Sequence, residues 1–377
     1  MLVNTTKENW TAHYLGVCVA VSFFSQIQPL QYILRPIMFV MWAICCMLCI
    51  VFRFRNSLSR ELLIFTGLYI ILSLYCVTLS ITGTAHLESN YLSVLTIPLI
   101  VSYIGESLFT CLTDRKIHIV VLYLYISALL FAIWVQSTYF TSYSQWINSL
   151  TYIFTQKNSA AQIWASSLLV GFFIFKPKVW YVRYILYASQ LYLVILIFLS
   201  NCRTSIFALL VTLCAFLVIT RKIKYFFITG LLATILLSTS SSFVQHALHL
   251  DKHSGGSLDD YSSGRIKLIE YALNVINDNF MFGVGHYYMD CSYVCILAEL
   301  GIIGFIIVET ILFLKFYKIY KWHRNKQPYS HLLVCLAIYL WASSMFEALP
   351  PFGPGVSAMT FWLLSSMIIR HKSPTIS

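Results

Sequence analysis

The sequence predicts an all-α polytopic membrane protein with about twelve transmembrane helices. Its 377 residues are 59% hydrophobic and only 10% charged, with a mean hydropathy of +0.77. Apolar runs of 18 or more residues without interior charge recur along the chain, as expected of helices that cross a bilayer. Basic residues also alternate between successive connections, which is typical of a polytopic protein.

We expect one integral membrane domain over residues 1–377. The first apolar run lacks a small-residue cleavage site and is predicted to be an uncleaved span. The spans are predicted at about 12–30, 36–52, 61–82, 91–111, 117–136, 159–175, 181–200, 204–220, 225–243, 292–314, 331–348 and 355–370.

The basic residues orient these spans. With both termini in the cytoplasm, 19 of the 25 Lys and Arg fall on the inner side, as the positive-inside rule predicts. This bias accounts for the net charge of +11, so nucleic acid is not expected as a partner. The six outer basic residues are Arg35, Lys157, Arg203, Lys252, Arg265 and Lys267.

Two larger loops are predicted on the outer side, at 137–158 and 244–291. Six of the 14 Asp and Glu residues lie between Phe243 and Asp290. A helix is expected from about Arg265 to Phe280, with Ser262 or Ser263 as its cap. Apolar residues at three- and four-residue spacing suggest that it lies on the membrane surface or across the mouth of the bundle. The apolar series is Ile266, Ile269, Leu273, Ile276 and Phe280.

Several chemistries lack a signature in the sequence. It has no Walker motif, no Gly-rich dinucleotide fingerprint and no Cys/His zinc spacing, so neither a metal nor a cofactor is expected. Most of the eleven cysteines lie in spans. A disulfide between Cys202 and Cys291, near the outer face, is left open because spacing alone cannot establish it.

Arg203 and Arg265 are the candidate anion-binding residues. Each is predicted to lie at an outer helix start, where unpaired N–H groups and the helix dipole favour an anion. A guanidinium adds bidentate recognition of phosphate. The alternative is that Arg203 snorkels to lipid headgroups and that Arg265 pairs with Asp259 or Asp260.

Four segments in order resemble the characteristic block of the O-antigen polymerase and ligase superfamily (Wzy and WaaL). They are residues 203–210 (RTSIFALL), 263–265 (SGR), 282–285 (FGVG) and 297–304 (LAELGIIG). Residues 158–161 (NSAA) resemble the polar entry to a span in the same family. The resemblance covers about 158–314.

The resemblance implies a metal-independent, C-type glycosyltransferase in the bacterial inner membrane. Its donor would be an undecaprenyl-pyrophosphate-linked oligosaccharide, attacked at the periplasmic face with inversion. The protein would contact membrane lipid. Whether it also binds a chain-length regulator is not decided by the resemblance. The substrate-binding residues would be Arg203, Arg265, Ser263, Gly264 and His286.

Asp290 decides between the two branches of the family. Ligases of the superfamily carry a His, followed by Asn, Ser or Gln, with nine residues between this dipeptide and a Gly-x-x-Gly pair. Counting back from the pair at Gly301 puts Asp290 at that position, with His286 four residues earlier. Asp290 could orient or deprotonate a sugar hydroxyl, or it could cap the tenth span. The missing His favours a polymerase.

A ligase and a flippase for a lipid-linked sugar are the alternatives. A flippase would hold its charges near the membrane midplane. Glu299 is the best candidate for such a charge, and its structural alternative is a hydrogen bond to a neighbouring helix.

Overall fold

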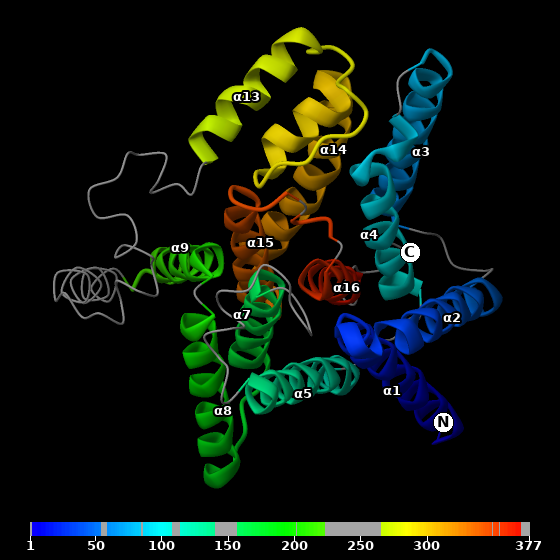
Figure 1. The fold of residues 1–377 in the computed structure, drawn as a ribbon. Helices are drawn as coiled ribbons and strands as arrows, with labels where there is room; N and C mark the ends of the chain where they lie inside the picture. The colour runs from blue at the N-terminus through cyan, green and yellow to red at the C-terminus, as the bar shows by residue number, and fades with distance from the viewer. Residues whose placement is uncertain are drawn as a thin grey trace, which may run out of the picture.

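In this computed structural model, the described part of the chain is helical and contains no strand. It comprises residues 2–53, 59–83, 86–107, 114–139, 157–200, 202–222, 265–348, 350–353 and 355–370. Figure 1 shows the helices crossing one another at varied angles around α7, α15 and α16. The helices are α1 (Leu2–Phe24), α2 (Gln28–Arg53), α3 (Arg60–Ile81), η1 (His86–Glu88), α4 (Asn90–Ser107), α5 (Asp114–Tyr139), α7 (Lys157–Ile174), α8 (Trp180–Leu199), α9 (Arg203–Ile219), α13 (Arg265–Asp278), α14 (Ser292–Arg324), α15 (Ser330–Ser344) and α16 (Val356–Arg370).

Five of these helices, α2, α3, α5, α8 and α14, are long and apolar enough to cross a membrane. Four shorter helices are also apolar: they lie at Trp10–Phe24, Arg203–Ile219, Ser330–Ser344 and Val356–Ile369. Large apolar side chains remain exposed along these helices, as expected of surfaces that face lipid. The described helices are those of a polytopic membrane protein.

Several predicted boundaries are wrong. The chain turns at residues 25–27 and α2 already begins at Gln28, so the predicted break at 31–35 does not exist. Pro29 lies in the first turn of α2, where its missing N–H costs nothing, and Pro36 lies inside the helix. α15 ends at Ser344, four residues before the predicted end. The predicted span 225–243 and residues 140–156 and 223–264 of the predicted loops lie outside the described residues.

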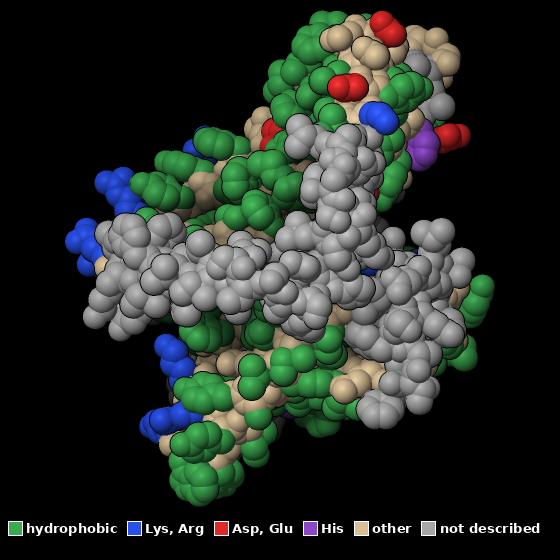
Figure 2. Space-filling view, turned by 60° about the vertical axis from the view of Figure 1, so that its left-hand side comes forward, with side chains coloured by type: hydrophobic (Ala, Val, Ile, Leu, Met, Phe, Trp, Pro, Cys, Tyr) green, Lys and Arg blue, Asp and Glu red, His purple; other side chains and the backbone are tan. Residues whose placement is uncertain are grey.

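Side chains of different helices meet at two of the helix ends. At one end, Asn158 at the start of α7 meets Glu347 just after α15. At the other end, Ser59 before α3 donates to Glu106 near the end of α4, at 2.6 Å. Figure 2 shows Lys and Arg side chains gathered along its left-hand edge, while most visible Asp, Glu and His side chains lie at the upper right. We call the end that carries Asn158 and Glu347 the site end.

A break in α14 shapes the site end. Gly301 has φ 64° and ψ −175° inside this helix, so residues 292–300 and 302–324 form two helical pieces. The break frees carbonyls of the first piece. Val284 N donates to the carbonyl of Ala298, and Gly285 N donates to that of Glu299, both at 2.9 Å. Residues 283–285 are therefore held against the break by backbone hydrogen bonds.

Glycine is required on both sides of this contact. Gly283 also has a positive φ of 71°, and a Cβ there would lie 2.5 Å from the carbonyl oxygen of Glu299. A Cβ on Gly301 would lie 2.5 Å from the carbonyl oxygen of Met281. Both positions thus need the backbone freedom and the close approach that only glycine allows. This explains physically why the two glycine-containing segments occur together.

Helices α3 and α4 support the same contact. The Tyr75 hydroxyl donates to the carbonyl of Leu300 at 2.9 Å, and His86 Nε2 lies 2.7 Å from the carbonyl oxygen of Phe282. The Glu299 carboxylate is buried and interacts with the backbone N–H groups of Asn90 and Tyr91 at the start of α4. A carboxylate at a helix N-terminus is a stabilising arrangement, which favours the structural alternative for Glu299.

Candidate functional site

A pocket of about 450 Å³ opens at the site end. It is formed by α9, α13, the start of α14 and the segment after α15, and it combines charged side chains with an apolar wall. Its lining residues are Arg203, Thr204, Ile206, Phe207, Leu210, Arg265, Ile266, Ile269, Met289, Asp290, Cys291, Met345 and Phe346. Three of the six candidate site residues, Arg203, Arg265 and Asp290, therefore meet in one cavity.

Arg265 lies at the first residue of α13, where the sequence predicted a helix start. Its Nη2 lies 3.6 Å from Asp290 Oδ2, and these side chains are 28% and 42% exposed. Its guanidinium lies over the ring of Phe346, 5.8 Å from the centroid. An aromatic face and a carboxylate thus hold the guanidinium in place. Asp259 and Asp260, the partners considered for Arg265, lie outside the described residues.

Arg203 is the first residue of α9 and lines the same pocket. The residue before it, Cys202, takes the N-cap position without a side-chain hydrogen bond to the helix. The first N–H groups of α9 are therefore not satisfied by a cap from that side chain. Cys202 and Cys291 are both free thiols, so the disulfide that the sequence left open does not form in this structure.

Asp290 is not the cap of α14. Cys291 takes the N-cap position, and the Asp290 side chain turns to Arg265 instead. The Tyr288 hydroxyl donates to Asp290 Oδ1 at 3.3 Å. Burial, followed by the charge of Asp290, raises the pKa of Tyr288 to about 12, so this hydroxyl keeps its proton at neutral pH. Asp290 is thus a partly exposed carboxylate held by one cation and one neutral donor.

The other candidates are not brought into the pocket. His286 is exposed and does not line it. The segment from Gly283 to Asp290 is not helical, so His286 and Asp290 are not related by one helical turn. Ser263 and Gly264 lie outside the described residues.

Glu347 is a site-end residue that the sequence analysis missed. It was placed inside the predicted span 331–348, but α15 ends at Ser344 and Glu347 lies in the following turn. Asn158 Nδ2 donates to Glu347 Oε1 at 3.2 Å, and the Thr204 side chain also hydrogen-bonds to this carboxylate. A carboxylate so close to a span end, followed by the turn-forming residues 350–355 (PPFGPG), is the signal that could have revealed it.

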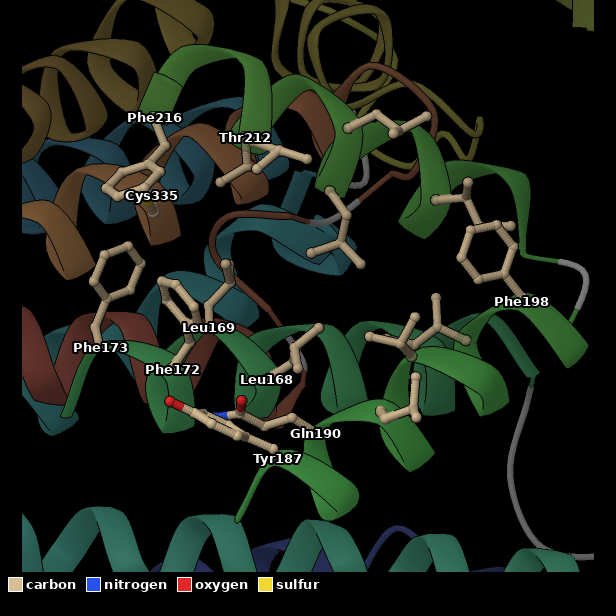
Figure 3. Close-up of a pocket in the computed structure, with 17 residues that line it drawn as sticks. Leu168, Leu169, Phe172, Phe173, Tyr187, Gln190, Phe198, Thr212, Phe216 and Cys335 are labelled. Carbon is tan, nitrogen blue, oxygen red and sulfur yellow. The ribbon is translucent and has the colours of Figure 1, made fainter. Parts of the chain in front are cut away.

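An apolar groove adjoins the pocket. It has a volume of about 490 Å³ and lies between α7, α8 and α9, with Cys335 of α15 at one side. Figure 3 shows the side chains from these helices surrounding this space, with Gln190 and Thr212 among the few polar ones. Ile206 and Leu210 of α9 line both the groove and the pocket. The charged pocket thus continues along α9 into an apolar groove.

The sequence was compared with models of known families. The model described as O-antigen ligase matches residues 188–293, which include Arg203, Arg265 and Asp290. This match places residues 188–293 in the O-antigen ligase-like superfamily. Among curated proteins, none matches the chain. The match confirms the resemblance seen in the sequence, and this family points to membrane enzymes of the O-antigen ligase or polymerase type, whose substrates are lipid-linked glycans.

Proposed function

We propose that the protein is a surface-polysaccharide polymerase of the O-antigen type. It joins undecaprenyl-pyrophosphate-linked repeat units at the periplasmic face of the inner membrane, with inversion at the transferred sugar. The observation that carries the proposal is the meeting of Arg203, Arg265 and Asp290 in one pocket beside an apolar groove.

The two arginines suit a diphosphate leaving group. Arg203 begins α9 and Arg265 begins α13, so two helix N-termini and two guanidinium groups meet at one cavity. Negative charge grows on the diphosphate as the bond to the sugar breaks, and prearranged positive groups stabilise that charge. The planar guanidinium can also bind two phosphate oxygens at once.

The groove suits the lipid part of the donor. A polyisoprenyl chain is apolar and long, and each CH₂ moved from water into an apolar site contributes about 0.8 kcal/mol. Because Ile206 and Leu210 line both cavities, a ligand with its diphosphate near Arg203 would extend its chain along α9. The groove thus completes a site with a charged head region and an apolar tail region.

Asp290 is the acidic group that this chain offers where ligases carry a His. Its ion pair with Arg265 fixes both side chains, so its proposed role is to orient the acceptor hydroxyl at the pocket mouth. The absence of the ligase His at this position supports the polymerase over the ligase. A ligase is the second candidate, because the matching family model carries that description.

The surface glycan of a deletion strain tests the assignment. Lipid cores that carry one repeat unit indicate a polymerase, and plasmid-borne wild-type protein should restore long chains. Bare cores with long lipid-linked polymer left in the inner membrane would show a ligase and overturn the polymerase assignment. Repeat units retained on the cytoplasmic side would show a flippase.

A further inference from the structure

The carboxylate of Glu347 lies where the separate parts of the site end converge. Asn158 reaches it from the start of α7 and Thr204 from the start of α9. Glu347 is not itself a lining residue of the pocket, but its partner Thr204 and the adjacent Phe346 are, and its charge acts on Asp290 and Arg265 of the same lining. Four segments that are distant in sequence are therefore arranged around one acidic side chain.

Glu347 differs from Asp290 in what holds it. Asp290 is 42% exposed and already neutralised by Arg265 at 3.6 Å. Asn158 and Thr204, which hydrogen-bond to the Glu347 carboxylate, are neutral donors. A carboxylate with neutral partners retains more affinity for a proton than one paired with a guanidinium. The Glu347 carboxylate therefore keeps an affinity for protons.

We propose that Glu347 takes the proton from the acceptor hydroxyl and that Asn158 and Thr204 are positioning residues for its carboxylate. This inference rests on the glycosyltransferase function proposed above. The acceptor oxygen bonds to the anomeric carbon as the bond from that carbon to the diphosphate oxygen breaks. The hydroxyl proton passes to Glu347, and the electron pair leaves with the polyprenyl diphosphate.

The surroundings of Glu347 tune it for this step. Burial raises the pKa of Glu347 to about 7, and the charge of Asp290 adds to the rise. Arg265 and the two hydrogen-bond donors act in the opposite direction. A general base works best when its pKa is close to the working pH. The charged or titratable groups that interact with Glu347 are Asp290, Arg265, Cys202, Tyr288 and Tyr339. Arg203 and Lys157 adjoin its partners Thr204 and Asn158 in the chain.

Single-turnover rates across neutral pH test the proposal. The probe is the lipid-linked repeat unit extracted from a deletion strain, incubated with full-length protein in lipid nanodiscs. The wild-type rate should rise about tenfold per pH unit below pH 7 and level off above it, because only ionised Glu347 accepts a proton. Glu347→Gln should lower the plateau rate by about 100-fold or more and abolish the acidic limb.

A matched control and a second variant keep the test decisive. Glu88, an exposed glutamate beside α4, provides the control, and Glu88→Gln should leave rate and pH profile unchanged. Asn158→Ala removes a donor that stabilises the Glu347 anion, so the acidic limb should move to higher pH. If Glu347→Gln does not fold, the pH–rate profile of Asn158→Ala tests the proposal instead. An acidic limb with the same midpoint as in the wild type would overturn the proposal.

Two failures are distinguishable. If wild-type protein transfers no sugar at any pH, the proposed function is wrong and this inference falls with it. If wild-type protein transfers sugar but Glu347→Gln matches its rate and profile, only the role of Glu347 is overturned.

Discussion

Replacing Gly301 by Ala should unfold the protein at a distinctly lower temperature. The residue combines φ 64° with ψ −175°, a region that is essentially restricted to glycine and costs other residues about 1–3 kcal/mol. The added Cβ would also lie 2.5 Å from the carbonyl oxygen of Met281, so the contact between the loop and α14 must open. We therefore expect a loss of at least about 3 kcal/mol when strain and lost hydrogen bonds are combined.

Two control glycines separate the causes. Gly67, inside α3, has a helical backbone, and a Cβ added there would meet no heavy atom within 4 Å, so Gly67→Ala should be neutral or stabilising by about 1 kcal/mol. Gly83 has equally open space but φ +104°, so Gly83→Ala should cost about 1–2 kcal/mol through the backbone alone. In thermal unfolding of the three purified variants in one detergent, the Tm should be highest for Gly67→Ala, lower for Gly83→Ala and lowest for Gly301→Ala. A Gly301→Ala Tm equal to that of Gly83→Ala would refute the role of the close contact.

Three further predictions concern the site. Arg203→Ala and Arg265→Ala should each lower the transfer rate by about 100- to 1,000-fold at unchanged protein level, with little rescue by Lys; full activity would show an anchor to lipid headgroups instead. Asp290→Asn should stop polymerisation while cores bearing one repeat unit persist, and long chains on that strain would rule out its role. Leu213→Trp should fill the groove and raise KM for the polyisoprenyl donor but not for a short-chain analogue. The control Leu63→Trp, on the exposed face of α3, should change neither KM value. If Leu213→Trp leaves KM for the polyisoprenyl donor at the wild-type value, the groove is not the lipid site.

The sequence alone was sufficient to predict the start of a helix where polar or charged residues directly precede its apolar series. The amphipathic helix after Arg265 and the start of α9 at Arg203 are found as predicted, because charged or small polar residues precede each apolar series. The turn between α1 and α2 was misplaced because Pro36 resembled a boundary, although the turn itself lies at residues 25–27. Glu347 was missed because the hydropathy of α15 concealed where that helix ends.

The break in α14 could not be predicted from local sequence. Gly301 lies in an apolar run that is compatible with a continuous membrane helix. What separates the two pieces is tertiary: N–H groups from residues 284 and 285 and the hydroxyl of Tyr75 replace the missing helical hydrogen bonds. Tyr75 and its partner Leu300 are 225 residues apart in the chain. Local pattern carries no information about such a pairing.

The way α14 is interrupted has a consequence for building chimeras between members of this superfamily. The segment that leads to Asp290 is anchored to the broken helix by its backbone, and the side chains of Tyr75 and His86 both contact its Phe282 carbonyl. A loop taken from a related protein would lose these hydrogen bonds if the residues that pair with it at positions 75 and 86 were not transferred too, even if the whole loop sequence were kept. Exchange of specificity should therefore succeed only when the loop, the break and the facing surfaces of α3 and η1 are transferred as one unit.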